Sequence, residues 1–209
     1  MARRYRLEYL KRKRAKEQKK ALKLEQQSKE NTIVKEILGW VLYIAIIIGA
    51  TYLIVNYVGQ RTRVIGSSME ATLHEGDNLI VDKISYRFRD PERFEIIVFP
   101  FKYKENTFYI KRIIGLPGET VQIIDGEVYI DGEVLNESYG LEKIDEDRKG
   151  IAAKPITLGE DEYFVLGDNR NNSSDSRDQS VGLLKKEDMM GRAWIRIWPL
   201  NNIGVIPHE

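Results

Sequence analysis

The sequence contains no cysteine and only two histidines, His74 and His208, among its 209 residues. A chain without cysteine has no disulfide, no thiol nucleophile and no cysteine-ligated metal site. Two histidines alone also make a poor case for a zinc site, so we expect no metal and no cofactor. An exported domain that does without disulfides fits this composition.

Charged residues are absent from one long stretch, the apolar run from Ile37 to Val55. A helix of this length crosses a hydrocarbon core about 30 Å thick. A buried core helix would keep a polar stripe, which this run lacks. A cleaved signal peptide would have a shorter apolar region and a small-residue cleavage site, and residues 56–61 lack that pattern. We therefore predict an uncleaved membrane anchor, with aromatic residues towards its ends at Trp40, Tyr43, Tyr52 and Tyr57.

Charge of one sign dominates only the segment before this run. The whole chain carries 33 basic and 32 acidic residues, but Lys and Arg prevail from Arg3 to Lys23, against only Glu8 and Glu17. Beside a membrane span, such an arm is explained by cytoplasmic placement and by attraction to anionic lipid. We therefore expect membrane lipid as a partner and no nucleic acid.

After the apolar run, short segments rich in β-branched and aromatic residues alternate with Gly, Pro and Asp, which predicts strands. The predicted strands are Asn78–Asp82, Phe94–Phe99, Phe108–Ile114, Val121–Ile124, Tyr163–Leu166 and Ala193–Trp198. Two Asp-Gly pairs, at 125–126 and 131–132, predict tight hairpin turns. Residues 137–150 are polar and predict a surface excursion.

Two residues have contexts that suit hydrolysis, although alone each would be an ordinary surface residue. Ser68 is a poor nucleophile without a base, and a neutral amine can serve as that base. Ser-Lys pairs are a known variant of the catalytic triad. Lys111 lies between Ile110 and Ile113, where burial is expected to lower its pKa from about 10.4 towards the operating pH. A later polar loop, residues 166–177, has hydroxyls and amides that can orient such a base.

Five segments, in this order, resemble the successive boxes of bacterial type I signal peptidases, also called leader peptidases. The segments are Gly66–Leu73, Gly76–Asp77, Arg93–Phe99, Tyr109–Gly118 and Gly167–Arg177. Each box is weak alone, but five in sequence behind a membrane anchor are highly specific. The resemblance implies a mainly β fold: a signal-peptidase-like β domain with coiled β-sheets, preceded by one N-terminal transmembrane α-helix.

The resemblance also implies roles for particular residues. Ser68, rather than Ser67, matches the nucleophile, Lys111 matches the general base, and Ser173 matches a serine that hydrogen-bonds to that lysine. Charged residues that match those bracing the site are Asp168, Arg112, Asp175 and Arg177. The residues expected to line the substrate groove are Val64, Ile65, Gly66, Met69, Phe108, Tyr109 and Ile110.

The sequence departs from the family's pattern at two places, Ala71 and Phe94-Glu95, and at Gly66 it lacks a side chain that some members use. Gly66 stands where some members add a hydroxyl to the oxyanion hole, so the hole is expected to rest on main-chain donors. Ala71 stands where proline is usual, and we expect a less constrained loop there. Phe94-Glu95 replaces the usual Gly-Asp. None of these changes affects Ser68 or Lys111. His74 and His208 are interpreted as a surface-loop residue and a tail residue.

The resemblance implies a membrane-bound serine endopeptidase that removes signal peptides from secretory pre-proteins after small residues, typically Ala-X-Ala, and acts as a monomer. The implied organisation is a cytoplasmic arm at 1–32, a single transmembrane helix at 33–58 and an extracytoplasmic catalytic β domain at 59–209, in the bacterial cell membrane. Residues 121–162 would contain a hairpin and surface insert. Two alternatives are an anchored, non-catalytic β domain that binds a secretory partner and a self-cleaving repressor-type Ser-Lys protease.

Overall fold

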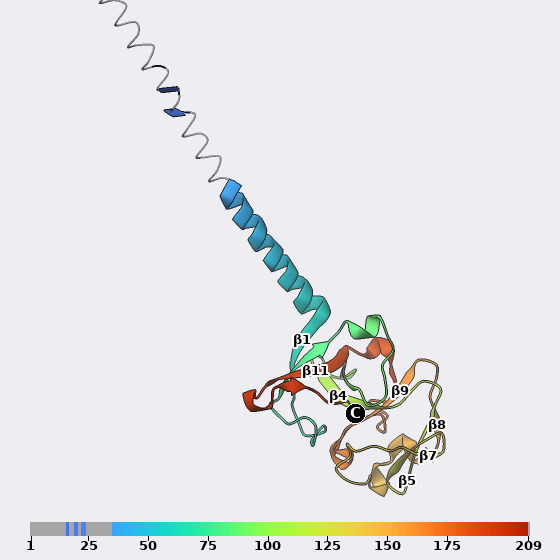
Figure 1. Cartoon of the computed structure of the whole chain (residues 1–209). Coiled ribbons are helices and arrows are strands. Elements are labelled where there is room, and N and C mark those ends of the chain that lie inside the picture. Colours follow the sequence, from blue (N-terminus) through green and yellow to red (C-terminus); the bar gives the residue numbers. More distant parts are fainter. Residues whose placement is uncertain (1–15, 17–18, 21, 24–34, 209) are drawn as a thin grey trace, which may run out of the picture. The chain divides into compact units, whose positions relative to one another are not determined.

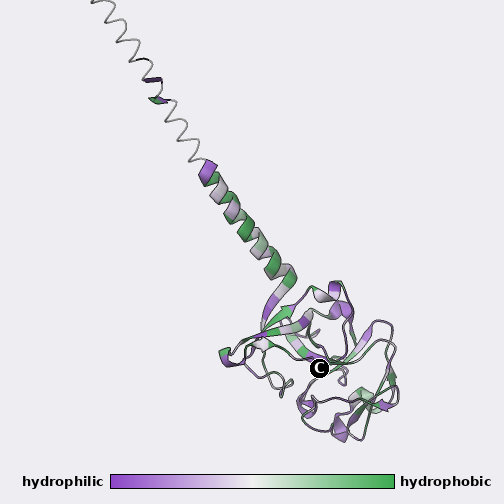
Figure 2. Ribbon diagram, viewed as in Figure 1, coloured by the Kyte–Doolittle hydropathy of each residue, from purple (hydrophilic) through white to green (hydrophobic). Residues whose placement is uncertain are grey.

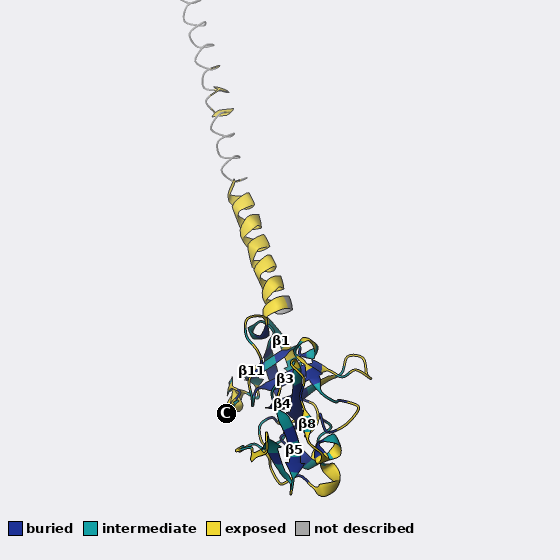
Figure 3. Ribbon diagram, turned by 90° about the vertical axis from the view of Figure 1, so that its right-hand side faces the viewer, coloured by how far each residue is buried: buried dark blue, intermediate teal, exposed yellow. Residues whose placement is uncertain are grey.

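The computed structural model of the chain describes residues 16, 19–20, 22–23 and 35–208, and its contacts divide the chain into two units, Met1–Leu53 and Ile54–Glu209. In the first unit, Lys35–Leu53 forms one helix that is long and apolar enough to cross a membrane. None of its apolar window is buried within the protein, and Figures 2 and 3 show apolar, exposed residues along it. Most of the predicted basic arm lies outside the described residues.

The second unit is built from antiparallel strands, which confirms the predicted fold class. The π-helix η1 (Ile54–Val58) leads into a sheet of order β1-β2-β11-β3-β4-β9-β10, with β12 paired to β11 (Figure 1). Its strands are β1 (Gly59–Arg63), β2 (Asn78–Asp82), β3 (Ile96–Pro100), β4 (Phe108–Gly115), β9 (Glu162–Leu166), β10 (Leu184–Lys185), β11 (Gly191–Trp198) and β12 (Gly204–Val205). Short 3-10 helices connect the strands of this unit: η2 (Ser85–Arg87), η3 (Glu146–Arg148), η4 (Gly150–Ala153), η5 (Arg170–Asn172), η6 (Lys186–Asp188) and η7 (Leu200–Asn202).

A second, four-stranded sheet has the order β7-β6-β5-β8, and Figure 1 places it at the far end of the domain from β1. Its strands are β5 (Thr120–Ile124), β6 (Glu127–Ile130), β7 (Glu133–Val134) and β8 (Ile156–Thr157). Both predicted Asp-Gly turns connect strands of this sheet. All four turn residues have positive φ, as a type I′ hairpin requires, and the values at Asp125 and Gly126 are 50° and 80°.

The central strand β3 explains why the large sheet has an apolar core on both faces. Ile96 and Val98 belong to one buried cluster, whereas Ile97 and Phe99 belong to another. Side chains alternate across a strand, so an uninterrupted apolar run is suited to a strand that is covered on both sides. Figure 3 shows this buried centre, where β3 and β4 lie side by side.

Strand β4 has one edge that is only half paired. It runs along β3 from Phe108 to Arg112, but its pairing with β9 begins at Arg112. The first four residues of β4 therefore have no strand partner on that side within the described part of the chain. Lys111 is the last residue of this open stretch.

Two residues with side chains adopt the left-handed region at positions where the sequence departs from the family's pattern. Ala71 has φ 83°, in a tight turn where the N–H groups of Thr72 and Leu73 both donate to the Met69 carbonyl. The ring of proline holds φ near −65°, so a proline does not fit this backbone. We expected a less constrained loop at Ala71. The structure instead has local backbone strain there, because a Cβ at positive φ is unfavourable.

Phe94 has φ 70°, which is a conformation that glycine adopts without cost. This residue interrupts the predicted strand Phe94–Phe99, and β3 begins at Ile96 instead. The aromatic ring compensates by packing: it lies 5.3 Å from the ring of Tyr139, between centroids. Phe94 thus has a strained backbone conformation, which its ring contact with Tyr139 offsets.

Substitution of Ala71 tests the turn directly. We expect Ala71→Gly to raise the free energy of unfolding by up to about 1 kcal/mol, because it removes the Cβ from a left-handed residue. Ala71→Pro should lower it by more than about 1 kcal/mol, because φ must change sign. Denaturant unfolding of the detergent-solubilised full chain measures both. A stabilising proline would show that the turn has the opposite sign of φ.

Candidate active site

Ser68 and Lys111 meet although 43 positions separate them in the sequence. Ser68 follows β1 in an irregular segment, and Lys111 lies within β4. Lys111 Nζ is 2.8 Å from Ser68 Oγ and donates a hydrogen bond to the Ile110 carbonyl at 3.0 Å. The predicted pair is therefore within hydrogen-bonding distance, as nucleophile and base require.

The amine of Lys111 is buried, with only 3% of the residue exposed. Burial disfavours the ammonium form and is the main reason that the pKa of Lys111 falls to about 8. The carboxylates of Asp175 and Asp168 act in the opposite direction, and Arg177 again lowers the pKa. A substantial fraction of the amine is consequently neutral near pH 8 and able to accept a proton.

Both nearby carboxylates are already bound to arginines. Asp168 accepts two hydrogen bonds from the Arg112 guanidinium, at 2.9 and 2.8 Å, and both side chains are fully buried. Asp175 accepts from Arg177 at 2.7 and 2.8 Å and also accepts from the Gly167 N–H at 3.0 Å. These bidentate pairs balance the charge of each carboxylate and fix its orientation.

The segment that bears Ser68 (residues 66–73) is attached to this charged framework through Thr72. Its hydroxyl donates to Asp168 at 2.6 Å and accepts from Arg112 at 3.2 Å. On its other face, the guanidinium of Arg112 lies 3.6 Å from the centroid of the Tyr139 ring. The sequence interpretation assigned no role to Thr72 or Tyr139. Thr72 lies within a recognised segment, but nothing local indicates which carboxylate its hydroxyl reaches.

Residues 137–150 do more than form the predicted surface excursion. Besides the contact of Tyr139 with Arg112, Glu137 forms an ion pair with the buried Arg170, and Ile144 is only 4% exposed. Arg170 Nε in turn donates to the Gly167 carbonyl at 3.1 Å. Most of the stretch is exposed, as predicted, but its polar composition gave no sign of these long-range ion pairs or of the single buried isoleucine.

Ser173 lies close to the pair but does not make the predicted bond to Lys111 in this structure. Its Oγ is buried and has no hydrogen-bond partner among the described residues. A buried hydroxyl without a partner costs about 1–3 kcal/mol. Gly167 permits this crowding, since a Cβ there would lie 2.3 Å from Ser173 Oγ and 2.5 Å from the Ser68 carbonyl oxygen.

The residues predicted to line the substrate groove do not share one environment. Val64, Met69 and Ile110 are buried in the same apolar cluster, so their side chains pack the core. Ile65 and Phe108 are exposed, by 83% and 40%. The remaining two differ again: Tyr109 stacks on Phe101 with centroids 4.6 Å apart, and Gly66 has φ 86°. Val64–Gly66 follows the end of β1 and is not itself a strand.

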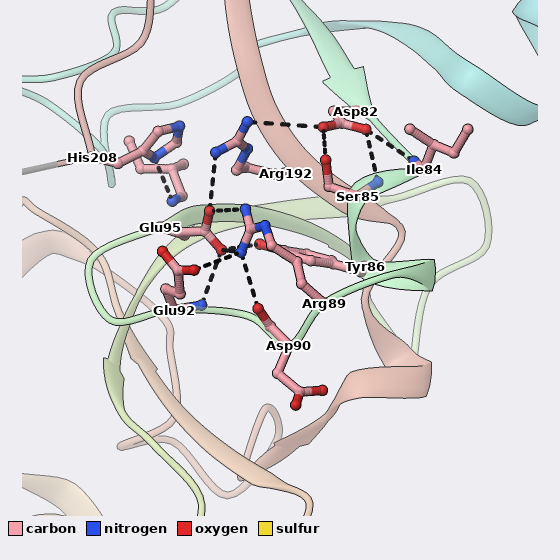
Figure 4. Close-up of polar contacts among 11 residues, drawn as sticks. Asp82, Ile84, Ser85, Tyr86, Arg89, Asp90, Glu92, Glu95, Arg192 and His208 are labelled. Atoms are coloured by element: carbon pink, nitrogen blue, oxygen red, sulfur yellow. Dashed lines mark hydrogen bonds and ion pairs between the residues drawn. The ribbon is translucent and has the colours of Figure 1, made fainter.

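Glu95, which stands where aspartate is usual, immediately precedes β3 and is the centre of a buried polar cluster (Figure 4). Its carboxylate accepts from Tyr86 Oη at 3.1 Å, from the Glu92 N–H at 3.0 Å, and from Arg89 and Arg192. Burial alone would raise the pKa of Glu95, but these donors outweigh it and the pKa lies below its ordinary value. The longer side chain thus serves as a structural anchor.

Neither histidine contacts the Ser-Lys pair. His74 is exposed and its Nδ1 lies 2.6 Å from Glu70, as expected for a loop residue. The interpretation of His208 as a tail residue was wrong. Its Nδ1 accepts the Ile96 N–H at 3.1 Å, and burial with the charge of Arg192 lowers its pKa to about 4 (Figure 4). The C-terminal segment is held to the sheet by β12 and by the buried Ile206.

A serine hydroxyl within hydrogen-bonding distance of a buried lysine amine is the arrangement on which Ser-Lys hydrolases rely. Residues 37–198 match the family described as "Signal peptidase, peptidase S26". A probable signal peptidase I-2 of Synechocystis sp. (strain ATCC 27184 / PCC 6803 / Kazusa) is 42% identical, over 74% of this chain and 70% of its own length. A signal peptidase I of Bacillus amyloliquefaciens is 36% identical, over 84% of this chain and 96% of its own length.

Similar solved structures include a signal peptidase I from Enterococcus faecalis V583, which is 37% identical, with a TM-score of 0.41. The match covers 50% of this chain and 97% of the solved chain. The sequence matches extend over most of the chain at more than 30% identity. The chain therefore belongs to the signal peptidase I family of serine endopeptidases, which remove signal peptides, as the resemblance implied.

The pKa of Lys111 makes a prediction for the pH dependence of activity. Only the neutral amine accepts a proton, and with a pKa of about 8 its fraction rises as the pH rises. We expect kcat/KM for a pre-protein to increase about tenfold between about pH 7 and 9, with its midpoint near the pKa of Lys111. Initial rates across that range measure it, and a flat profile would contradict a titrating amine.

The close approach at Gly167 predicts a loss of activity without loss of the fold. In Gly167→Ala the added methyl must displace Ser68 or Ser173, and a displacement of about 1 Å can cost about 10²-fold in rate. Gly204→Ala is the matched control, because a Cβ there meets nothing within 4 Å. Steady-state rates and thermal unfolding separate the two effects. Equal activity of both variants would show that the loop absorbs the methyl.

Proposed function

We propose that Ser68 is the nucleophile and Lys111 the general base of a membrane-anchored signal peptidase. The observation that carries the proposal is the 2.8 Å separation between Ser68 Oγ and Lys111 Nζ, with the amine buried. A neutral amine takes the proton of the serine hydroxyl as Oγ attacks the scissile carbonyl carbon. The resulting ammonium donates that proton to the amine that leaves, and an acyl-enzyme remains.

Hydrolysis of the acyl-enzyme uses the same base. Water gives a proton to Lys111 and its oxygen attacks the ester carbon. Collapse of the tetrahedral intermediate then breaks the bond to Ser68 Oγ, which regains its proton from the ammonium. The backbone N–H of Ser68 is the proposed oxyanion-hole donor in both halves of the reaction.

Ser173 has a role in the charged state of the base in this mechanism. An ammonium has three N–H donors, and two acceptors for them are Ser68 Oγ and the Ile110 carbonyl. The buried, unpartnered Oγ of Ser173 is the proposed third acceptor. Asp168, Arg112, Asp175 and Arg177 are proposed to hold the loops that bear these groups, through the two bidentate ion pairs described above.

The open edge of β4 is the proposed binding site for the pre-protein. In the described part of the chain, Phe108–Lys111 pair with β3 alone, so their second edge can hydrogen-bond to an extended peptide. Addition of a strand to a free edge is a common mode of peptide recognition. Val64–Gly66 would contact the opposite side of the peptide, with exposed Ile65 available to it and Met69 supporting the segment from within the core.

The proposed topology follows from the apolar helix and the basic arm before it. Positive charge favours the cytoplasmic side, so the arm (1–32) would be cytoplasmic, the anchor (33–58) would cross the bilayer once, and the β domain (59–209) would face outward. Confinement of enzyme and precursor to one membrane raises their effective concentration. A monomer suffices for this chemistry, because every proposed reacting group comes from one chain.

Cleavage of a purified pre-protein by the detergent-solubilised full chain tests the assignment. We expect a cut after an Ala-X-Ala site, lost in Ser68→Ala and in Lys111→Ala. Lys111→Arg should also be inactive, because a guanidinium stays protonated. The control is Lys143→Ala, which removes an exposed lysine paired with Glu127.

The outcomes also separate the two alternatives from the proposal. Cleavage of its own chain with the precursor left intact would indicate a self-processing protease. A precursor that is bound but never cut would indicate a non-catalytic binding domain. Cleavage that survives Ser68→Ala would exclude Ser68 as the nucleophile.

A further inference from the structure

A single residue, Asn169, is hydrogen-bonded to both peptide groups that flank Ser68. Its side-chain Nδ2 donates to the Ser67 carbonyl at 3.1 Å, and its backbone N–H donates to the Ser68 carbonyl at 3.1 Å. The rotations about Ser68 that would turn either peptide group are thus opposed from outside the segment. Asn169 itself follows β9 and the crowded Gly167. Its loop is bound to Arg112 through Asp168 and is closed by the bond from the Gly167 N–H to Asp175.

The Ser67 carbonyl matters because of what shares its plane. A peptide group is planar, so the direction of the Ser67 C=O sets the direction of the Ser68 N–H. That N–H is the proposed oxyanion-hole donor, and Gly66 supplies no side-chain hydroxyl as a second one. The Glu70 N–H donates to the same carbonyl at 3.0 Å, so two donors hold this peptide in one orientation.

Hydrogen bonds to a carbonyl also strengthen the N–H of the same amide as a donor. Charge is drawn towards the accepting oxygen, and the N–H becomes more positive, which is the cooperativity of hydrogen-bonded amides. Asn169 therefore acts on the Ser68 N–H in two ways: it fixes where the group points, and it increases the strength of the bond that the group can donate.

We propose that Asn169 is a positioning residue of the oxyanion hole, acting through the Ser67–Ser68 peptide. The inference rests on the proposed function of Ser68 and extends it to a residue that touches no reacting atom. It requires that Asn169 stabilise the negatively charged intermediate more than the bound substrate, and that it leave the base Lys111 unaffected.

Asn172 provides a matched control in the same loop. Its Nδ2 donates at 2.8 Å to the side-chain Oγ of Ser67, not to the carbonyl. A bond to that hydroxyl holds the segment without acting on the peptide group. If simple attachment of the segment that bears Ser68 were the role of this loop, the two asparagines would contribute similarly.

The first test compares Asn169→Ala, Asn169→Asp and Asn172→Ala in the full chain with a pre-protein substrate. We expect Asn169→Ala to lower kcat by about 10–100-fold with KM nearly unchanged, somewhat less than the loss of an oxyanion donor itself. Asn169→Asp should be at least as slow, because it replaces the donor with a carboxylate facing the Ser67 oxygen. Asn172→Ala should stay within about threefold, and the pH midpoint should not move in any variant.

A second measurement separates a role in the oxyanion hole from a structural one. Peptide esters and thionoesters of one sequence differ only in the atom that enters the hole, and sulfur accepts hydrogen bonds poorly. The ratio of the ester rate to the thionoester rate should therefore fall in Asn169→Ala and stay at the wild-type value in Asn172→Ala. Thermal unfolding midpoints identify any variant that has lost its fold. If Asn169→Ala is one of them, Asn169→Asp, which keeps the size of the side chain, takes its place in the comparison.

Three results would overturn the inference. They are a kcat of Asn169→Ala within twofold of wild type, an unchanged ester-to-thionoester ratio despite slower turnover, or a shifted pH midpoint, which would place the effect at Lys111. Ser68→Ala is measured in parallel. If that variant retains activity, the proposed function fails, irrespective of the result for Asn169.

Discussion

The arrangement depends on one interaction, the contact of a desolvated amine with one hydroxyl. An exposed lysine would be charged at neutral pH and unable to take a proton from serine. Burial in β4 removes water from Lys111, and the carbonyl of Ile110 and the hydroxyl of Ser68 are its hydrogen-bonding partners. Burial in the sheet therefore bears on the proposed chemistry as well as on stability, because it is the main cause of the lowered pKa of Lys111.

The same low dielectric strengthens the effect of nearby carboxylates on the pKa of Lys111. An unpaired aspartate near Lys111 would favour the ammonium and return the pKa towards its ordinary value. Pairing Asp168 with Arg112 and Asp175 with Arg177 limits that effect, and each pair also fixes a loop. A buried ion pair adds little net stability. Its value here lies in geometry, since Asp168 is joined to Thr72 on the segment that bears Ser68 and Asp175 to the Gly167 N–H.

What was predictable from the sequence was local. The runs that became β2, β4 and β9, and the two Asp-Gly hairpins, carry their signal within a few residues. The distant pair Ser68 and Lys111 was predicted only through the resemblance to a family. Other contacts between distant segments left no signal in the sequence: Asn169 and Ser67 are 102 positions apart, and His208 and Ile96 are 112 apart. The left-handed φ at Ala71 and Phe94 was also beyond prediction, because neither residue type favours that conformation.

The loop after β9 (residues 167–177) connects the segment that bears Ser68 to strand β4. Asp168 attaches it to Arg112 of β4, and Asp175 closes the loop internally on Arg177 and the Gly167 N–H. Gly167 allows the loop to approach Ser68, and Asn169 holds the peptides on either side of that serine. A rate enhancement that depends on charge developing in the transition state requires donors already in place, since reorganisation during the reaction would cost part of the gain. Because this loop and β4 are both anchored to the buried sheet, the Ser68 hydroxyl, the Lys111 amine proposed as base and the Ser68 N–H proposed as oxyanion donor are held in place before any substrate binds.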